Sequence, residues 1–142
     1  VLVVHPYERT IREQYRKRKL LFKDQRILPE FELKTVKAVQ TIANTPSEFS
    51  SWFEALEYTE EQIDRTDYDI AILGCGAYGL PLAAHIKRQG RKAVNLGGST
   101  QFLFGITGKR WDGHPMINTY WVRPSADETP ALAAKVEGGC YW

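Results

Sequence analysis

The chain has very few sulfur-containing residues, with two cysteines and one methionine among 142 residues. Cys75 and Cys140 cannot build a disulfide framework, and their separation matches no zinc-binding spacing. Such sparse cysteine is typical of proteins that work in a reducing compartment. We therefore expect both thiols to be free and the protein to be cytoplasmic.

Long apolar runs are also lacking. No stretch approaches the roughly 18 residues of a membrane-spanning helix, and no signal-peptide pattern is present. The net charge is only +2, so charge gives no reason to expect a nucleic-acid partner. A hydrophobic content of 43% and a charged content of 25% are ordinary for a globular domain. We expect one domain over residues 1–142, and the composition does not indicate an oligomeric state.

An initiator methionine is absent as well, and the chain opens directly on the strand-like Val1-Leu2-Val3-Val4. A strand without any lead-in suggests a fragment of a longer chain that lacks its N-terminal part. We treat this as an expectation, and part of an active site would then lie in the missing sequence.

The most informative stretch that is present runs from Tyr68 to Trp111, where strand, glycine-turn and helix patterns occur twice. Parallel strands need crossover helices, so this alternation predicts an α/β fold with a Rossmann-like, mostly parallel sheet flanked by helices. The predicted elements are a strand at 69–73, the G-x-G-x-x-G turn at 74–79, a helix at 80–89, a strand at 92–96, a turn at 97–98 and a helix capped by Ser99 or Thr100.

Weaker patterns surround this unit. They predict a strand over 1–4, a helix starting at Glu8 or Thr10 and reaching Phe22, and a strand over 31–39. A further helix, capped by Thr45 or Ser47, should extend to Ile63 and bury Trp52, Phe53, Leu56 and Ile63 in the core. Residues 117–122 fit either a strand or a helix. The aromatic end of the tail, 136–142, should dock on the domain rather than be disordered.

The two glycine turns are the main functional signal. Glycine lets backbone approach a ligand closely, and a helix N-terminus presents free N–H groups to an anion such as a diphosphate. Gly74, Gly76 and Gly79 therefore indicate a phosphate-binding turn, with Gly97 and Gly98 in a second turn beside it. The alternative is a tight turn whose glycines only let helix and strand pack.

The dinucleotide fingerprint is nevertheless incomplete. It calls for an acidic residue about 20 residues beyond the glycines, where the second strand ends. This strand ends in Ala93-Val94-Asn95-Leu96 and carries no Asp or Glu. Asn95 could hydrogen-bond a hydroxyl, but a nicotinamide or flavin cofactor is less favoured, and a nucleotide sugar fits the same geometry.

Two other groups are candidate site residues. Lys109 and Arg110 lie beside Trp111, and a guanidinium next to an indole suits a phosphate or a sugar ring; the alternative for Arg110 is a salt bridge to Asp112. His5 ends the first strand and has Glu8 nearby, a possible acid–base pair. His85 fits better as a packing residue, and the three histidines share no metal-ligand spacing.

Several segments together resemble the GT-D fold class of bacterial glycosyltransferases. The resemblance covers about a third of the chain and extends loosely to residues 5–7 and 137–142. The segments that carry it are LGCGAYGLPLA at 73–83, with Lys87 and Gly90, then AVNLGG at 93–98, QFLFGI at 101–106 and GKRW at 108–111.

This resemblance implies a nucleotide-sugar donor, a glycan acceptor and transfer of a hexose between them. Under this hypothesis His5 or Glu8 activates the acceptor hydroxyl, and Arg110 offsets charge on the leaving diphosphate. The donor-binding residues would be Gly74, Gly76, Tyr78, Gly79, Asn95, Gly97, Gly98, Gln101, Lys109 and Arg110.

The sequence departs from this family in one motif. Family members hold a divalent metal, Mn or Mg, with an acidic D-x-E-type motif preceded by an arginine, and no R-x-G-D-G-E-like stretch occurs here. Either the motif lies outside this chain, which leaves the metal ligands and the cofactor unknown, or the chain is a non-catalytic relative. Two alternatives stay open: an NAD(P)-type oxidoreductase, which the G-x-G-x-x-G turn favours, and a non-catalytic Rossmann-like binding module, which the missing metal motif favours.

Overall fold

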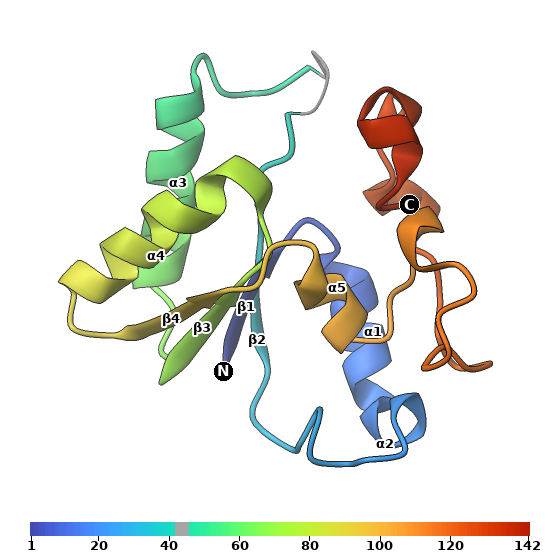
Figure 1. Ribbon diagram of the computed structural model, residues 1–142. Helices are drawn as coiled ribbons and strands as arrows, with labels where there is room; N and C mark the ends of the chain where they lie inside the picture. Colours follow the sequence, from blue (N-terminus) through green and yellow to red (C-terminus); the bar gives the residue numbers. More distant parts are fainter. Residues whose placement is uncertain (42–45) are drawn as a thin grey trace.

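Four short parallel strands form the centre of the molecule in a computed structural model, which describes residues 1–41 and 46–142 (Figure 1). They lie in the order β2-β1-β3-β4, and each neighbouring pair is parallel. This confirms the predicted α/β fold with a parallel sheet flanked by helices. The strands are β1 (Leu2–His5), β2 (Lys34–Lys37), β3 (Ile70–Leu73) and β4 (Lys92–Asn95).

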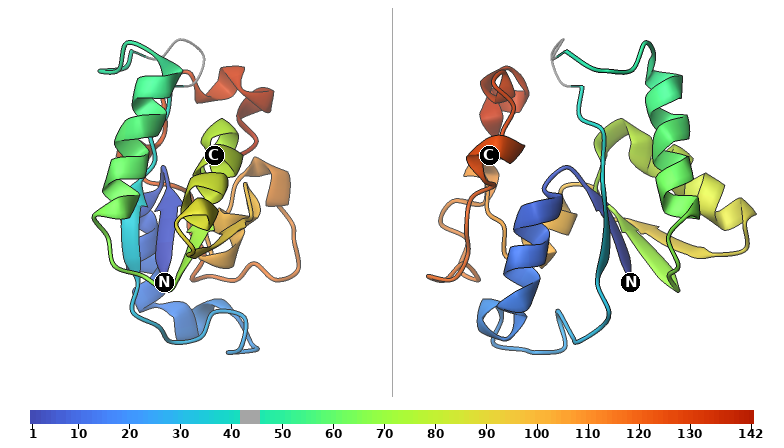
Figure 2. Two further views of the ribbon diagram at one scale, coloured as in Figure 1. Left: turned by 90° about the vertical axis from the view of Figure 1, so that its left-hand side faces the viewer. Right: turned by 180° about the vertical axis from the view of Figure 1, so that it is seen from behind.

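Helices cover both faces of this sheet (Figures 1 and 2). On one face α3 (Trp52–Asp64) and α4 (Gly79–Arg88) pack on Leu2 and Val4, forming a cluster that we call the α3–α4 core. On the other face α1 (Glu8–Arg16), α2 (Arg18–Leu21) and the loop after α5 (Ser99–Leu103) pack on Val3, forming the α1 core. Because successive side chains of a strand point to opposite faces, β1 contributes to both cores.

The strand order reverses between β1 and β3. From β1 the chain moves outward to β2, and it then returns past β1 to form β3 and finally β4. Loops on the two sides of such a point diverge, which leaves a crevice at the carboxyl ends of the strands where ligands of open α/β sheets bind.

Three helix predictions need correction. The helix expected over 8–22 is interrupted at Lys17, whose φ of −99° and ψ of 11° end α1 before α2 begins. The α3 helix begins only at Trp52, where the Ser51 hydroxyl caps it by accepting from the Glu54 N–H, so Ser47 is not its cap. Thr45, the other expected cap, lies outside the described residues. Gly98 rather than Ser99 or Thr100 is the N-cap of α5, and Thr100 donates its hydroxyl to the Leu73 carbonyl instead.

The expected burial of α3 is wrong at its N-terminal end. Trp52 is 38% exposed and Phe53 is 69% exposed, whereas Ile63 is fully buried. The first turn of α3 lies beyond the carboxyl ends of the strands (Figure 1), where the Trp52 ring packs on Phe53 and Tyr78. Residues 117–122 form neither a strand nor a helix, and Val122 makes only an isolated bridge with Ile106.

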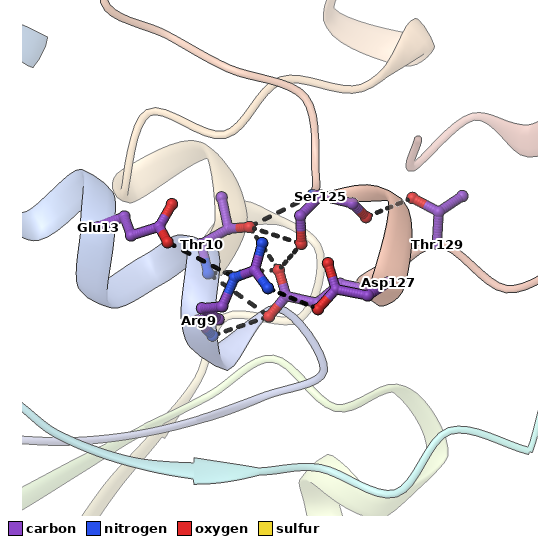
Figure 3. A network of polar contacts seen from close by, with 7 residues as sticks. Arg9, Thr10, Glu13, Ser125, Asp127 and Thr129 are labelled. Atoms are coloured by element: carbon purple, nitrogen blue, oxygen red, sulfur yellow. Dashed lines mark hydrogen bonds and ion pairs between the residues drawn. The ribbon is translucent and has the colours of Figure 1, made fainter.

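A network of polar contacts joins the tail to the first turn of α1 (Figure 3). Glu128 accepts from the backbone N–H of Arg9 at 2.8 Å and of Thr10 at 3.3 Å, and from the hydroxyls of Thr10 and Ser125. The first residue of α1 has no side-chain cap of its own, because Tyr7 occupies the N-cap position. Glu128 therefore supplies, from the far end of the chain, the acceptor that this helix terminus needs.

Candidate functional site

A cavity of about 490 Å³ opens at the carboxyl edge of the sheet. It lies at the point where the strand order reverses, between His5 at the end of β1 and Gly74 at the end of β3. Segments that follow all four strands form its walls, together with two side chains from helices and four from the tail. These are residues 5–7, 39–41, 74–78 and 97–98, with Trp52, Gln101, Val136, Glu137, Tyr141 and Trp142.

The three glycines of the first turn have different roles. A Cβ on Gly74 would lie 2.6 Å from both His5 Cδ2 and Thr100 Cβ, and one on Gly79 would lie 2.7 Å from Asn95 Oδ1, so both glycines permit close packing. Gly76 has a φ of +57° and only open space where a Cβ would be. Gly74 and Gly79 thus have the packing role considered for this motif, whereas Gly76 borders the cavity with open space beside it.

A short 3₁₀ turn, η2 (Gly76–Tyr78), starts at this glycine and leads directly into α4. No side chain caps its N-terminus, where Cys75 is the N-cap. Backbone N–H groups at such a terminus are unpaired donors. The N–H groups of Gly76 and Ala77 have no acceptor within η2, whereas that of Tyr78 donates to the Cys75 carbonyl at 3.2 Å.

The second glycine turn also reaches the cavity. Gly97 has a φ of +54° with open space around it, and Gly98 follows it in the cavity wall. Asn95 does not line the cavity, because its side chain packs beside Gly79 and accepts from the Gly97 N–H at 3.3 Å. Asn95 thus stabilises the conformation of the Gly97-Gly98 turn.

His5 is in the cavity wall but has unusual electrostatics. The ring is only 4% exposed, and its Nδ1 accepts from the Tyr7 N–H at 3.0 Å. Burial lowers the pKa of His5 to about 3, because the charged ring would lose its hydration. The ring is therefore neutral near pH 7, and since Nδ1 accepts a hydrogen bond, its proton resides on Nε2.

Glu8 is not brought next to His5. Its carboxylate pairs with Arg12 one turn along α1 and accepts from the Thr35 hydroxyl of β2 at 2.6 Å. Glu8 is also not among the residues that line the cavity. The acid–base pair expected from the sequence is thus not assembled by direct contact.

Lys109 and Arg110 lie just outside the cavity, in the 3₁₀ turn η3 (Lys109–Trp111). The Arg110 guanidinium lies over the rings of Trp111 and Tyr141, at 5.2 and 5.1 Å from their centroids. Asp112, the alternative partner considered for Arg110, pairs with Arg123 at 2.5 Å instead. Arg110 Nη1 would be 3.4 Å from a Cβ on Gly98, so the cation lies beside the second glycine turn.

The C-terminal segment, residues 136–142, forms the wall that sequence reasoning did not assign to the site. Gln101 donates to the Tyr141 carbonyl at 3.0 Å, while the N–H groups of Lys109 and Arg110 donate to Trp142 and Cys140. Gly108 leaves room for the C-terminal segment, because a Cβ at position 108 would lie 2.6 Å from the backbone oxygen of Tyr141. The aromatic composition of the segment correctly indicated docking, but nothing local in the sequence indicated where.

Two polar atoms of the cavity-lining residues are buried without a partner. They are the hydroxyl of Tyr78 and the indole Nε1 of Trp142. The Tyr78 ring stacks against Trp52 at a centroid distance of 5.0 Å and an angle of 6°. Both atoms are buried away from the open space of the cavity, since Tyr78 belongs to the α3–α4 core and Trp142 packs against the α1 core, so neither atom is presented to an occupant.

Neither a metal cluster nor a bilayer-spanning helix is found in the part of the chain that the structure describes. Among residues 1–41 and 46–142, no group of three or more His, Cys, Asp or Glu side chains could hold a metal ion. None of the described helices combines the length and the apolarity that crossing a bilayer requires. Comparisons with models of known protein families, with curated proteins and with solved structures found no match.

Proposed function

We propose that this chain is a domain of a GT-D-like glycosyltransferase that binds a nucleotide-sugar donor in the cavity at the carboxyl edge of the sheet. One observation carries the proposal: both glycine turns border one cavity, each with an open glycine at positive φ, where the strand order reverses. Such a place is where nucleotides bind in open α/β sheets.

The glycine turns and the cations beside them suit the diphosphate of the donor. The diphosphate lies at the rim, against the uncapped N–H groups of η2 and the Gly97-Gly98 turn, with Arg110 beside it. Arg110 is held by two aromatic rings, so its charge is oriented before the ligand arrives and can offset charge that builds on the leaving diphosphate. Lys109 lies next to it and adds a second positive charge.

In the proposed reaction an acceptor hydroxyl oxygen bonds to the anomeric carbon of the sugar, and the bond from that carbon to the diphosphate oxygen breaks. The hydroxyl proton leaves to a base, and the electron pair of the broken bond stays on the diphosphate. His5 and Glu8 stay predictions for the base. With its proton on Nε2 and a pKa of about 3, His5 is better suited to donate a hydrogen bond than to take a proton.

The residues described here do not fit the divalent metal that the family resemblance implies. Such ions take several oxygen ligands, and Glu137 is the single carboxylate that lines the cavity. We therefore derive no step through a metal. The resemblance would require its ligands to come from outside this chain.

A ligand panel tests the proposal: UDP-glucose, UDP-galactose, GDP-mannose and CDP-glucose, against NAD and NADP, measured by thermal shift and calorimetry. A ligand at 100 times its dissociation constant adds about 2.7 kcal/mol of stability. We expect a nucleotide sugar to bind and Arg110→Ala to weaken it about tenfold, as loss of one charged hydrogen bond would.

Arg91→Ala is the matched control, because Arg91 also lies over a tyrosine ring, Tyr68, at 4.8 Å, but it donates to the Thr66 carbonyl, whereas Arg110 lies beside Gly98 of the second glycine turn. It should leave the affinity unchanged. Binding of NAD or NADP alone would favour the oxidoreductase instead. Nucleotide-sugar binding without any hexose transfer by the full-length protein would favour a non-catalytic binding module.

A further inference from the structure

The sheet has an open edge at β4. The strand order β2-β1-β3-β4 places β4 at the end of the sheet, and the structure describes no further strand in residues 96–142. An edge strand carries a row of backbone N–H and C=O groups that can pair with a strand of another chain. The outer edge of β4 is therefore a surface at which the sheet can be extended.

The hydrogen bonds to β3 determine which backbone groups of β4 point outward. The Leu96 N–H donates to the Leu73 carbonyl at 3.0 Å, on the β3 side. Because the backbone groups of alternate residues point to the same side of a strand, Val94 also faces β3, whereas Ala93 and Asn95 face outward. In the part of the chain that the structure describes, neither Ala93 nor Asn95 has a backbone partner on the outer side.

The side chains on one face of β4 are exposed. Val94 is 43% exposed, and Leu96, just beyond the strand, is 38% exposed. Lys92 lies on the same face, because alternate side chains of a strand share a face. The other edge strand, β2, differs: its Val36 is buried and a lysine stands at each of its ends, a composition that keeps an edge unpaired. Of the two edges, β4 is thus the one suited to pairing.

The outer edge of β4 is complementary to itself when two copies lie antiparallel. Ala93 of one copy then faces Asn95 of the other, and each such pair exchanges both N–H···O bonds about a twofold axis. Val94 meets Val94 of the second copy at the axis, and each Lys92 lies opposite a Leu96. The outward backbone groups and the apolar side chains of both copies are therefore paired in the same register.

The charge pattern also fits this arrangement. The two Lys92 side chains lie four residues apart along the paired strands, or about 13 Å, which exceeds the Debye length of about 8 Å at physiological salt. A parallel arrangement would instead place the two lysines side by side, where like charges destabilise a pair of strands. The antiparallel arrangement is thus the one in which charge does not oppose pairing.

We infer that β4 is a dimer interface, at which a second copy of this chain adds its own β4 in antiparallel orientation to form one continuous sheet. This inference does not depend on the proposed function. The strands of the two copies run in opposite directions, so the two cavities lie at opposite edges of the joined sheet.

Sedimentation equilibrium from micromolar to millimolar concentration tests the interface, and the unaltered chain should reach twice the mass of a single chain. Val94→Lys should raise the dissociation constant about a hundredfold, because it brings two like charges together at the axis. Val94→Glu should have the same effect for the same reason. An equimolar mixture of the two variants should restore the dimer, since opposite charges then meet, and this rescue shows that both variants fold.

Leu20→Lys is the matched control. Leu20 is 47% exposed and belongs to α2, which lies away from β4 (Figure 1). The same lysine at this position should leave the dissociation constant unchanged.

Amide hydrogen exchange tests the register. The Ala93 and Asn95 amides should be protected in the dimer and exchange at least about tenfold faster in Val94→Lys, whereas the Leu96 amide, which bonds to β3, should be protected in both. A single-chain mass at every concentration would overturn the inference, as would a dimer that Val94→Lys leaves intact or that leaves both outward amides unprotected. Assemblies that grow beyond two chains would exclude a closed twofold contact and would also overturn it.

Discussion

His5 shows how burial alone can define the chemistry of a residue. Its sequence position, at the end of a buried strand, indicated the ligand side of the sheet, and the structure places it in the cavity wall. Burial among packed neighbours then removes the property for which histidine is usually chosen, since the ring does not take a proton near neutral pH. The ring contributes the Nε2–H group as a donor. It also packs so closely on position 74 that only glycine fits there.

The lowered pKa makes stability depend on pH. The unfolded chain protonates His5 below about pH 6.5, whereas the folded chain does so only near pH 3, so the unfolded state binds more protons between these values. Stability contributed by neutral His5 is complete above pH 6.5 and falls as the pH decreases towards 3. At 1.36 kcal/mol per pH unit, the free energy of unfolding should fall by about 2 kcal/mol between pH 7 and pH 5 from this group alone.

Urea unfolding of His5→Asn at several pH values isolates this contribution. Asparagine keeps an acceptor for the Tyr7 N–H, in the manner of an Asx turn, but cannot be protonated. The difference in unfolding free energy between the two chains should change by about 2 kcal/mol over the interval from pH 7 to pH 5. Parallel pH profiles would show that His5 titrates normally in the folded state.

At the scale of elements, α1 is completed by a residue 119 positions away from its second residue. Tyr7 cannot cap α1 with its side chain, and Glu128 accepts from the first N–H groups in its place. Asp127, the neighbouring carboxylate, is exposed and pairs with Arg9 at 2.9 Å. We therefore expect Glu128 to contribute much more to the free energy of unfolding than its neighbour Asp127.

Glu128→Gln should lower the free energy of unfolding by about 1–3 kcal/mol, because buried donors would lose a charged acceptor. Asp127→Asn should have almost no effect, because exposed ion pairs contribute little. Chemical denaturation of both variants measures the difference directly. Equal losses in the two variants would contradict the assignment of Glu128 as the cap of α1.

At the scale of the whole molecule, the sheet couples its two cores. Neighbouring residues of β1 and β3 pack on opposite faces, so neither core can form without the strands that build the other. The tail joins the same unit through Trp121, which packs edge to face against Phe22 and Phe102 in the α1 core. The described parts of the chain should therefore unfold together.

Equilibrium unfolding in urea should show one transition, with the same midpoint for far-ultraviolet circular dichroism and for tryptophan fluorescence. A variant that keeps Trp121 as its only tryptophan reports on the α1 core, and one that keeps only Trp52 reports on the first turn of α3. The three midpoints should coincide. A separate, earlier transition of the Trp121 signal would show that the tail and the α1 core unfold independently of the sheet.

The sequence by itself determined the local elements and their class. Apolar runs of four or five residues, glycine turns and Pro81 in a first helical turn specify strands and helices through short-range sterics, and the alternation of these elements requires parallel strands. The turn at Gly76 and the location of His5 followed from the same signals. Errors arose where contacts with distant segments decide burial, as at Trp52 and Phe53, whose helical spacing is that of a core face although both side chains are exposed.

Only the tertiary structure decided which residues share the cavity. Glu137, Tyr141 and Trp142 reach it because Gly108 leaves room for the tail and because Gln101 and the η3 backbone bind it. Glu8 and Asn95 are turned to other partners, although they lie near the glycine turns or the first strand in the sequence. Contacts between segments about 40 to 140 residues apart depend on packing, which no local pattern encodes. The sequence therefore predicted the glycine turns of the site but not the segments that form its other walls.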